Sequence, residues 1–289
     1  MELAIFDAEL NRLEAWRAPT PKESYQSFLD SVVSMIEKAD HITQVRGTVG
    51  IGLPGLVDPE GCAVSSNIPC IHGRRLKDDI SARLSRPVSF ENDVKAFAFS
   101  EANGGAGEEQ KYVLGVVLGT GVSGGLCIDG RLYSGSRNVS EFGHLLLPAI
   151  IQQRYQFPLR VCGCGRTSCI EQYLSGPGLL GLCSHFHSRY TTVAELIQSL
   201  QRGDTQALEI FSAYVDCLGS YLAQLTLVFD PNIIVLGGGL SNIPELYQML
   251  PGAISEYLFA GVNVPRVVAP KFGDSSGVRG VALLGHRYA

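Results

Sequence analysis

The sequence contains no apolar run long enough to cross a membrane. Its longest apolar stretches, residues 113–118 and 233–236, fall far short of the roughly 20 residues that a membrane-spanning helix needs. The amino-terminal residues also lack the basic start and the long apolar centre of an export signal. We therefore expect a cytoplasmic protein without a membrane partner.

An excess of positive charge is lacking as well. The chain has 23 Lys and Arg residues against 28 Asp and Glu residues, a formal net charge of -5. Because such a chain offers no basic field to polyanions, we expect no nucleic-acid partner. The motifs Gly-Lys-Ser and Gly-Lys-Thr do not occur, and their absence excludes the P-loop mode of phosphate binding.

The remaining composition is that of a globular protein. The 289 residues, 45% of them apolar, suffice for one large domain or two ordinary ones. Strand-like segments alternate with helical patterns, which is typical of an α/β fold. The glycine-rich residues 104–110 predict a hinge between two lobes. We assign residues 1–109 to an amino-terminal lobe and residues 110–275 to a carboxyl-terminal lobe, with residues 276–289 packing back on the first.

The clearest helical pattern covers residues 25–36, where apolar side chains recur at helical spacing. Thr20 and Glu23 precede it with the spacing of a capping box, and Pro21 suits the first helical position. We therefore expect an amphipathic helix that is capped by Thr20.

A glycine-rich segment, Leu118-Gly119-Thr120-Gly121-Val122-Ser123-Gly124-Gly125, follows an apolar strand. Its glycines allow backbone N–H groups to approach a phosphate. The spacing also matches the dinucleotide-binding pattern, but that pattern opens a helix, whereas residues 124–133 indicate a strand, an Asp-Gly turn and a strand. The segment predicts a phosphate-binding hairpin, with a glycine turn that binds nothing as the alternative.

Cysteine is clustered at one place, Cys162-x-Cys164-x4-Cys169, and His144 lies upstream. Thiolates at this spacing with one imidazole are typical of a closed zinc site, which stabilises a loop and does not activate water. The alternative is three cysteines that pack or oxidise together. Disulfides are rare in the cytoplasm, which favours zinc over this alternative. The spacing alone identifies the cysteines better than it identifies His144.

Acidic residues near these motifs indicate a polyhydroxylated ligand. Zinc coordination by His144 and the cysteines would bring Glu141 and Glu171 into one neighbourhood, where carboxylates accept hydrogen bonds from hydroxyl groups. Asp93 follows Asn92 at the end of a predicted strand and suits the general base of phosphoryl transfer. The alternative for Asp93 is a helix cap.

Taken together, the sequence resembles the ROK family of sugar kinases, within the hexokinase and actin-like superfamily. The matching segments run in family order over nearly the whole chain: Gly50-Ile-Gly-Leu-Pro-Gly55, Asn67-Ile-Pro69, Glu91-Asn-Asp93, Leu118 to Gly125, Glu141-Phe-Gly-His144, Cys162-Gly-Cys-Gly165, Cys169-Ile-Glu171, Asp230-Pro-Asn232, Val235 to Asn242 and Gly273 to Gly280. The resemblance implies an α/β protein of two ribonuclease-H-like lobes. It also implies a homodimeric kinase that uses ATP and Mg²⁺ to phosphorylate the 6-hydroxyl of an amino sugar, N-acetylglucosamine, and that carries a structural Zn²⁺.

The resemblance also assigns roles to residues. Asp93 is implied to be the catalytic base. The sugar-binding residues implied with it are Asn67, Asn92, Glu141, His144 and Glu171. The ATP-binding residues implied are Gly119, Thr120, Gly121, Val122, Ser123, Gly124, Gly125, Leu126, Gly237, Gly238 and Gly239. The zinc ligands implied are His144, Cys162, Cys164 and Cys169.

The sequence departs from the family pattern at its start. The family opens with a strand and an Asp-x-Gly-Gly-Thr-Lys hairpin ahead of the segment equivalent to residues 2–7, and these residues contain no such motif. We therefore expect an amino-terminal sheet without its first strand and with one phosphate loop fewer. Lys95, close after the predicted base, is a second departure that bears on substrate preference. The alternative functions are a kinase for N-acetylmannosamine or glucose and a non-catalytic sugar-binding protein.

Overall fold

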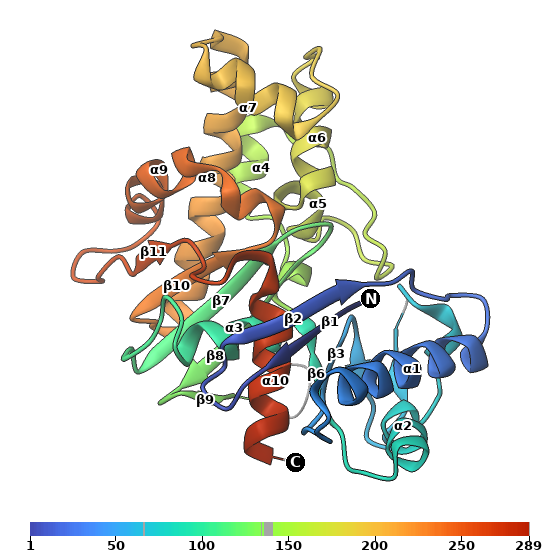
Figure 1. The fold of residues 1–289 in the computed structure, drawn as a ribbon. Coiled ribbons are helices and arrows are strands. Elements are labelled where there is room, and N and C mark those ends of the chain that lie inside the picture. Colours follow the sequence, from blue (N-terminus) through green and yellow to red (C-terminus); the bar gives the residue numbers. More distant parts are fainter. Residues whose placement is uncertain (66, 134, 136–140, 289) are drawn as a thin grey trace.

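The computed structural model describes residues 1–65, 67–133, 135 and 141–288. Strands and helices alternate along the chain, as the sequence predicted (Figure 1). Their order is β1 (Glu2–Phe6), β2 (Arg12–Arg17), α1 (Tyr25–Thr43), β3 (Gly50–Leu53), β4 (Leu56–Val57), β5 (Ala63–Val64), α2 (Leu76–Leu84), β6 (Ser89–Asn92), α3 (Asp93–Ala102), β7 (Tyr112–Leu118), β8 (Val122–Ile128), β9 (Arg131–Leu132), α4 (Ala149–Tyr155), α5 (Glu171–Leu174), α6 (Gly176–His185), α7 (Val193–Gln201), α8 (Thr205–Phe229), β10 (Ile233–Gly237), α9 (Pro244–Ser255), β11 (Arg266–Val268) and α10 (Ser276–Tyr288).

The carboxyl-terminal half is organised around a five-stranded sheet with the order β11-β10-β7-β8-β9. Its central strand β7 is antiparallel to β8 and parallel to β10. An antiparallel meander that continues into parallel strands is the sheet of a ribonuclease-H-like lobe. The predicted fold class is therefore confirmed for this half by the strand order itself.

The amino-terminal strands form three separate pairs, and β4 is antiparallel to β5 in the smallest of them. β1 is antiparallel to β2, and β3 is parallel to β6. In the described residues no strand joins β1 to β3. The result is the arrangement of the carboxyl-terminal sheet without the equivalent of β7, which agrees with the expected lack of the first strand.

Helices α3 and α10 lie between the two sets of strands (Figure 1). α3 packs against β7 and β8, while α10 packs against β3 and β1. The two helices approach closely at Gly280 of α10, where a Cβ would lie only 1.9 Å from the carbonyl oxygen of Ala96 in α3. α3, which the predicted boundary assigns to the amino-terminal lobe, packs both on α10 and on the carboxyl-terminal sheet.

The start of α1 differs from the prediction. The helix begins at Tyr25, and its cap is Ser24, whose hydroxyl accepts from Ser27 N at 3.3 Å. The Thr20 hydroxyl accepts instead from the Met1 ammonium group at 3.0 Å. The predicted capping box is therefore wrong, because residues 20–24 are not helical and α1 begins only at Tyr25.

Within the described part of the chain, no helix combines the length and the apolar character needed to cross a bilayer.

Candidate active site and metal site

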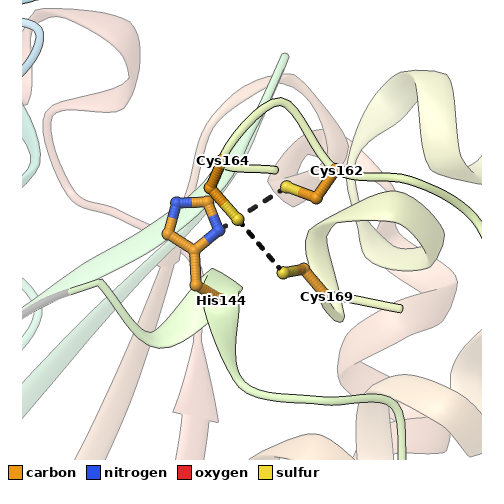
Figure 2. Close-up of side chains that lie close together, drawn as sticks. All are labelled: His144, Cys162, Cys164 and Cys169. Atoms are coloured by element: carbon orange, nitrogen blue, oxygen red, sulfur yellow. Dashed lines mark hydrogen bonds between the residues drawn. The ribbon is translucent and has the colours of Figure 1, made fainter. Parts of the chain in front are cut away.

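Three cysteines and one histidine converge at one point of the structure (Figure 2). One possible ligand atom from each of His144, Cys162, Cys164 and Cys169 lies within 4.8 Å of the others. Cys164 Sγ lies 3.5 Å from Cys169 Sγ, and Cys162 Sγ lies 3.7 Å from His144 Nδ1. Cys162 and Cys169 are buried, and Cys164 is exposed.

Backbone hydrogen bonds bring His144 to the cysteine loop. Leu145 O accepts from Ile170 N at 2.7 Å, and Leu147 N donates to Ser168 O at 2.8 Å. These two bonds pair the segment after His144 with the segment around Cys169. The histidine is therefore positioned by a tertiary contact, which explains why spacing alone identified it less well than the cysteines.

The donor set fits a tetrahedral zinc ion. Zinc–sulfur bonds of about 2.3 Å in a tetrahedron separate ligand atoms by about 3.8 Å, close to the 3.5 and 3.7 Å separations in the cluster. The backbone N–H of Arg166 also lowers the pKa of the Cys164 thiol, which favours the thiolate that binds metal. All four ligands come from protein side chains, as in structural sites.

Ser168, next to Cys169, has a left-handed backbone with φ of 62°, and its hydroxyl is buried without a partner among the described residues. Replacing it with glycine (Ser168→Gly) is expected to raise the free energy of unfolding by about 1 kcal/mol, because it removes both costs. Chemical denaturation of the zinc-loaded protein measures the change. Ser168→Ala removes only the hydroxyl and is expected to give a smaller gain. A Ser168→Gly protein less stable than the native one would contradict this account.

Two carboxylates flank the cluster. Glu141 Oε2 lies 3.7 Å from His144 Nε2. Glu171 Oε1 lies 3.7 Å from Cys162 Sγ, and its other oxygen accepts from Val122 N at 3.0 Å. Glu171 therefore connects the cysteine loop with the start of β8. A change in the conformation of this loop would move the residues that follow the glycine-rich turn.

Asp93 is the first residue of α3, directly after β6. Asn92 caps this helix through its side-chain oxygen, which accepts from Val94 N and Lys95 N, and its amide nitrogen donates to Gly55 O at 2.9 Å. Asn92 is therefore the cap of α3, and Asp93 Oδ1 also accepts from Val94 N at 3.0 Å. Asp93 is exposed, but it lies in a concave region with protein around it. Desolvation by the surrounding protein raises the pKa of Asp93, and the charge of Glu141 raises it further.

A cavity of about 380 Å³ joins predicted sugar-binding residues from distant segments. Its lining includes Asn67, Glu141 and Gly55. His72 also lines it, although the sequence analysis did not select His72. The signal available for His72 was its place soon after the matched segment Asn67-Ile-Pro69.

The two predicted nucleotide segments meet at the ends of β7 and β10. The turn at residues 119–121 joins antiparallel strands, as the hairpin interpretation required. Gly176 N donates to Gly119 O at 2.8 Å, which ties this turn to the start of α6. A Cβ at Gly238, where φ is 77°, would lie 2.5 Å from Leu118 O, so glycine is needed for the two turns to touch.

Part of the predicted phosphate segment lies elsewhere. Gly124, Gly125 and Leu126 are buried within β8. A Cβ at Gly124 would lie 2.9 Å from the Phe142 ring, and one at Gly125 would lie 2.7 Å from Ala98 Cβ. These glycines allow close packing under the sheet, and the open turn is confined to the residues before them.

Lys95, which the sequence analysis noted as a departure from the family pattern, is buried on α3 with 4% of its surface exposed.

The fold defines an α/β protein of the ribonuclease-H-like class, and its cysteine–histidine cluster could hold a metal ion. The model of the ROK family matches residues 1–288, and the chain belongs to this family.

Known relatives and solved structures agree with this membership. The N-acetylgalactosamine kinase AgaK of Shewanella sp. (strain ANA-3) is 46% identical over 287 residues, which cover 99% of this chain and 93% of the relative. An N-acetyl-D-glucosamine kinase of Photobacterium profundum is 40% identical over 288 residues, covering 98% of this chain and 95% of the relative. The crystal structure of a ROK hexokinase from Thermus thermophilus superimposes with a TM-score of 0.83 at 30% identity and covers 98% of this chain and 97% of that chain. A ROK family glucokinase from Streptomyces griseus, solved in complex with glucose and AMPPNP, gives a TM-score of 0.79 at 27% identity, with 98% of this chain and 95% of that chain covered.

Proposed function

We propose that the protein is a kinase that transfers the terminal phosphoryl group of ATP to the 6-hydroxyl of N-acetylglucosamine. The observation that carries this proposal is the position of Asp93, an open carboxylate at a helix start whose pKa is raised by desolvation and by Glu141. Glu141 in turn lines the cavity shared with Asn67. The printed names of relatives that are 39–46% identical support the class of reaction.

Asp93 acts as the general base. Its carboxylate takes the proton of the sugar 6-hydroxyl while that oxygen bonds to the terminal phosphorus and the bond from phosphorus to the ADP oxygen breaks. Because its pKa is raised, the carboxylate accepts a proton more readily than an ordinary aspartate. Asn67, Glu141, His144 and Glu171 are proposed to hold the other hydroxyl groups. Asn92 retains one amide hydrogen for the sugar, since its other groups cap α3 and bind Gly55.

The glycine turns at residues 119–121 and 237–239 are proposed to hold the phosphates and the adenosine. Gly119 N is used within its turn, where it donates to Gly121 O at 3.0 Å, and Val122 N is used by Glu171. The amides of Thr120 and Gly121 are therefore the ones proposed for phosphate binding. Mg²⁺, when bound with ATP, neutralises part of the phosphate charge.

Substituting Gly238 tests the nucleotide site. Gly238→Ala introduces a side chain at positive φ and 2.5 Å from Leu118 O, which forces the two turns apart, and we expect KM for ATP to rise by about tenfold or more. Gly252→Ala is the control, because a Cβ there meets no atom within 4 Å and Gly252 lies on α9, outside the proposed nucleotide segments. Initial rates at varied ATP concentration measure both variants. Equal KM values for the two would contradict the assignment.

N-acetylgalactosamine is the second candidate substrate, and the 46% identity to the Shewanella kinase favours it. The two sugars differ only in the configuration at carbon 4, so both present the same 6-hydroxyl to Asp93. A coupled ADP-release assay with N-acetylglucosamine, N-acetylgalactosamine, N-acetylmannosamine and glucose separates the candidates by kcat/KM. Calorimetric binding of a sugar without turnover of any sugar would instead support the non-catalytic alternative.

The structural zinc is proposed to hold His144 and the cysteine loop in place and to take no part in the chemical step.

We also propose a homodimer in the cytoplasm. Large apolar side chains are exposed around the metal loop and offer a surface for a second copy: Leu145, Leu146, Ile150, Leu159 and Val161. Thiolate ligands are compatible with a reducing compartment. Light scattering after size exclusion measures the oligomeric state.

A further inference from the structure

The cavity of about 380 Å³ in the candidate active site is lined by the residues that directly follow β3. β3 and β6 run parallel, and Leu53 pairs with Asn92 at the ends of these two strands. The residues that follow them, Gly55 after β3 and Asp93 after β6, therefore leave the same edge of the pair. The Asn92 amide nitrogen also donates to Gly55 O at 2.9 Å. The cavity thus lies next to the proposed catalytic base.

The position of Asp93 determines which side of a bound sugar enters this cavity. In a pyranose ring, carbon 2 lies across the ring from carbon 5, which bears the 6-hydroxymethyl group. Glu141, which is proposed to hold ring hydroxyl groups, lines the cavity, and its charge acts on Asp93. A ring held by Glu141 with its 6-hydroxyl at Asp93 therefore directs a substituent from its opposite side into the cavity.

One wall of the cavity is apolar. It is formed by Pro54, Leu56 and Val64, and Val64 has 38% of its surface exposed. Leu56 and Val64 are directly paired in the antiparallel β4–β5 hairpin, so their side chains lie on the same face. A hydroxyl group gains nothing from such a wall, whereas a methyl group is removed from water there. The wall therefore favours a substituent that carries a methyl group.

The polar residues of the lining differ in what they offer a ligand. Ser65 is buried, and its hydroxyl donates to Pro54 O at 2.7 Å and accepts from Ile68 N at 3.3 Å. Asn67 and His72 are exposed, and within the described part of the chain their side chains make no hydrogen bond to the protein. An imidazole donates through a ring nitrogen, so His72 offers a donor to a carbonyl oxygen.

The backbone around His72 is fixed, although its side chain is exposed. Ile71 is fully buried. Gly73 N donates to Ala63 O at 2.8 Å, and Arg74 O accepts from Ala63 N at 2.8 Å. These two bonds hold the segment against β5, which carries part of the apolar wall. The imidazole therefore lines the cavity from its exposed side, beside the wall.

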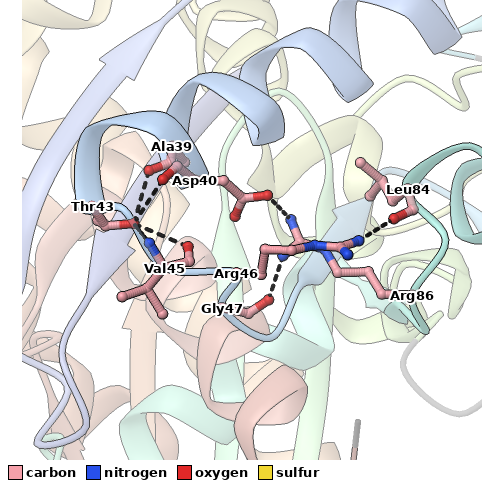
Figure 3. A network of polar contacts seen from close by, with 8 residues as sticks. All are labelled: Ala39, Asp40, Thr43, Val45, Arg46, Gly47, Leu84 and Arg86. Carbon is pink, nitrogen blue, oxygen red and sulfur yellow. Dashed lines mark hydrogen bonds and ion pairs between the residues drawn. The ribbon is translucent and has the colours of Figure 1, made fainter.

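The two sides of the cavity are supported by one polar network (Figure 3). Arg86 donates to Asp40 Oδ2 in α1 at 2.7 Å and to Gly47 O, shortly before β3, at 2.9 Å. Arg46 donates to Leu84 O at the end of α2 at 2.6 Å. β3 leads to one side of the cavity, and α2 follows the segment that carries the imidazole. The network joins both sides before a sugar binds, which reduces the conformational freedom lost on binding.

We propose that this cavity binds the 2-acetamido group of an N-acetylhexosamine and that His72 determines the preference for acetylated sugars. The imidazole donates to the acetamido carbonyl oxygen, and the methyl group packs against the apolar wall. A hydroxyl group on carbon 2 offers neither the carbonyl nor the methyl group. The inference rests on the sugar orientation of the proposed function, in which the 6-hydroxyl lies at Asp93.

Isothermal titration calorimetry of the full chain without ATP tests the role of His72. Two matched pairs of sugars are used, N-acetylglucosamine with glucose and N-acetylgalactosamine with galactose, and the weaker member of each pair is measured by displacement of the tighter one. The members of a pair differ only on carbon 2. We expect His72→Ala to weaken binding of the acetylated sugar by about fivefold to tenfold and to change binding of its partner by less than about twofold, because only the former loses a hydrogen bond.

His41→Ala is the control for this experiment, since His41 is an exposed histidine near the end of α1 and does not line the cavity. We expect it to change the affinity for none of the four sugars. Equal weakening of both members of a pair by His72→Ala, or weakening of neither, would overturn the proposal. Failure of the native chain to bind either N-acetylhexosamine would overturn it as well.

Val64→Thr tests the apolar wall independently. Threonine keeps the branched shape of valine but places a hydroxyl group against the methyl group of the sugar. We expect it to weaken binding of N-acetylglucosamine by about threefold and to leave N-formylglucosamine, which lacks the methyl group, unchanged. A comparable loss for both sugars would overturn the placement of the methyl group.

Saturation-transfer NMR on the native chain gives a readout that requires no variant. The acetyl methyl protons are expected to receive more saturation than the ring protons, and the reverse order would overturn the proposal. The kinase activity fails separately. A sugar that binds with this discrimination but is never phosphorylated would contradict the proposed function alone. Phosphorylation that His72→Ala slows equally for acetylated and unacetylated sugars would contradict only the role of His72.

Discussion

Replacing Asp93 with asparagine (Asp93→Asn) is expected to lower kcat by about a thousandfold. Asparagine occupies nearly the same volume but cannot accept the proton of the sugar hydroxyl. A coupled ADP-release assay at saturating ATP and sugar measures the loss. Asp78→Asn is the matched control, since Asp78 also lies in the first turn of a helix, α2, and is exposed. We expect the control to retain its kcat, and a comparable loss in both variants would contradict the assignment.

The raised pKa of Asp93 gives this prediction a pH dependence and a stability readout. The base must be ionised to act, so kcat/KM is expected to fall as the pH drops through a pKa that lies above the ordinary range of aspartate. The folded state binds this proton more tightly than the unfolded state, so its contribution to stability falls as pH rises through the same window. Asp93→Asn lacks a desolvated charge at neutral pH and is expected to have a melting temperature at least equal to that of the native protein. A lower melting temperature would point to a structural role.

Replacing Cys169 with serine (Cys169→Ser) is expected to release the zinc and to lower kcat/KM by about a hundredfold or more. The cluster holds His144 and Cys162, and these lie 3.7 Å from Glu141 and Glu171 respectively. Loss of the ion therefore displaces two proposed sugar ligands and, through Glu171, the amide of Val122. Elemental analysis and steady-state kinetics on the same preparation measure both effects.

Cys183→Ser is the control for the cysteine experiment. Cys183 is also fully buried, on α6, but it is not part of the metal cluster. We expect it to retain one zinc ion per chain and its turnover. Zinc retained at native stoichiometry by Cys169→Ser would remove this residue from the ligand set.

Features that depend on short segments were predictable from the sequence. The cysteine loop, the β7–β8 hairpin and the strand β7 itself are encoded by neighbouring residues, and the structure reproduces each of them. Their residue patterns are contained in short segments, although β7 also pairs with the distant strand β10.

Features that depend on distant contacts were not predictable. The cap of α1 is Ser24, and the Thr20 hydroxyl instead contacts Met1, nineteen residues away in the sequence. Gly124 and Gly125 match a ligand-binding pattern, yet they serve close packing against Phe142 and Ala98. Because glycine has no side chain, it allows a phosphate and a packed neighbour to approach the backbone equally well. The pattern alone therefore does not distinguish the two uses.

The most direct measurement of the central claim is phosphorus NMR of the product. The protein is incubated with ATP, Mg²⁺ and each N-acetylhexosamine. The account predicts a sugar 6-phosphate formed in step with ADP, and formed about a thousandfold more slowly with Asp93→Asn. Formation of no phosphosugar, or equally fast formation by the native protein and Asp93→Asn, would contradict it.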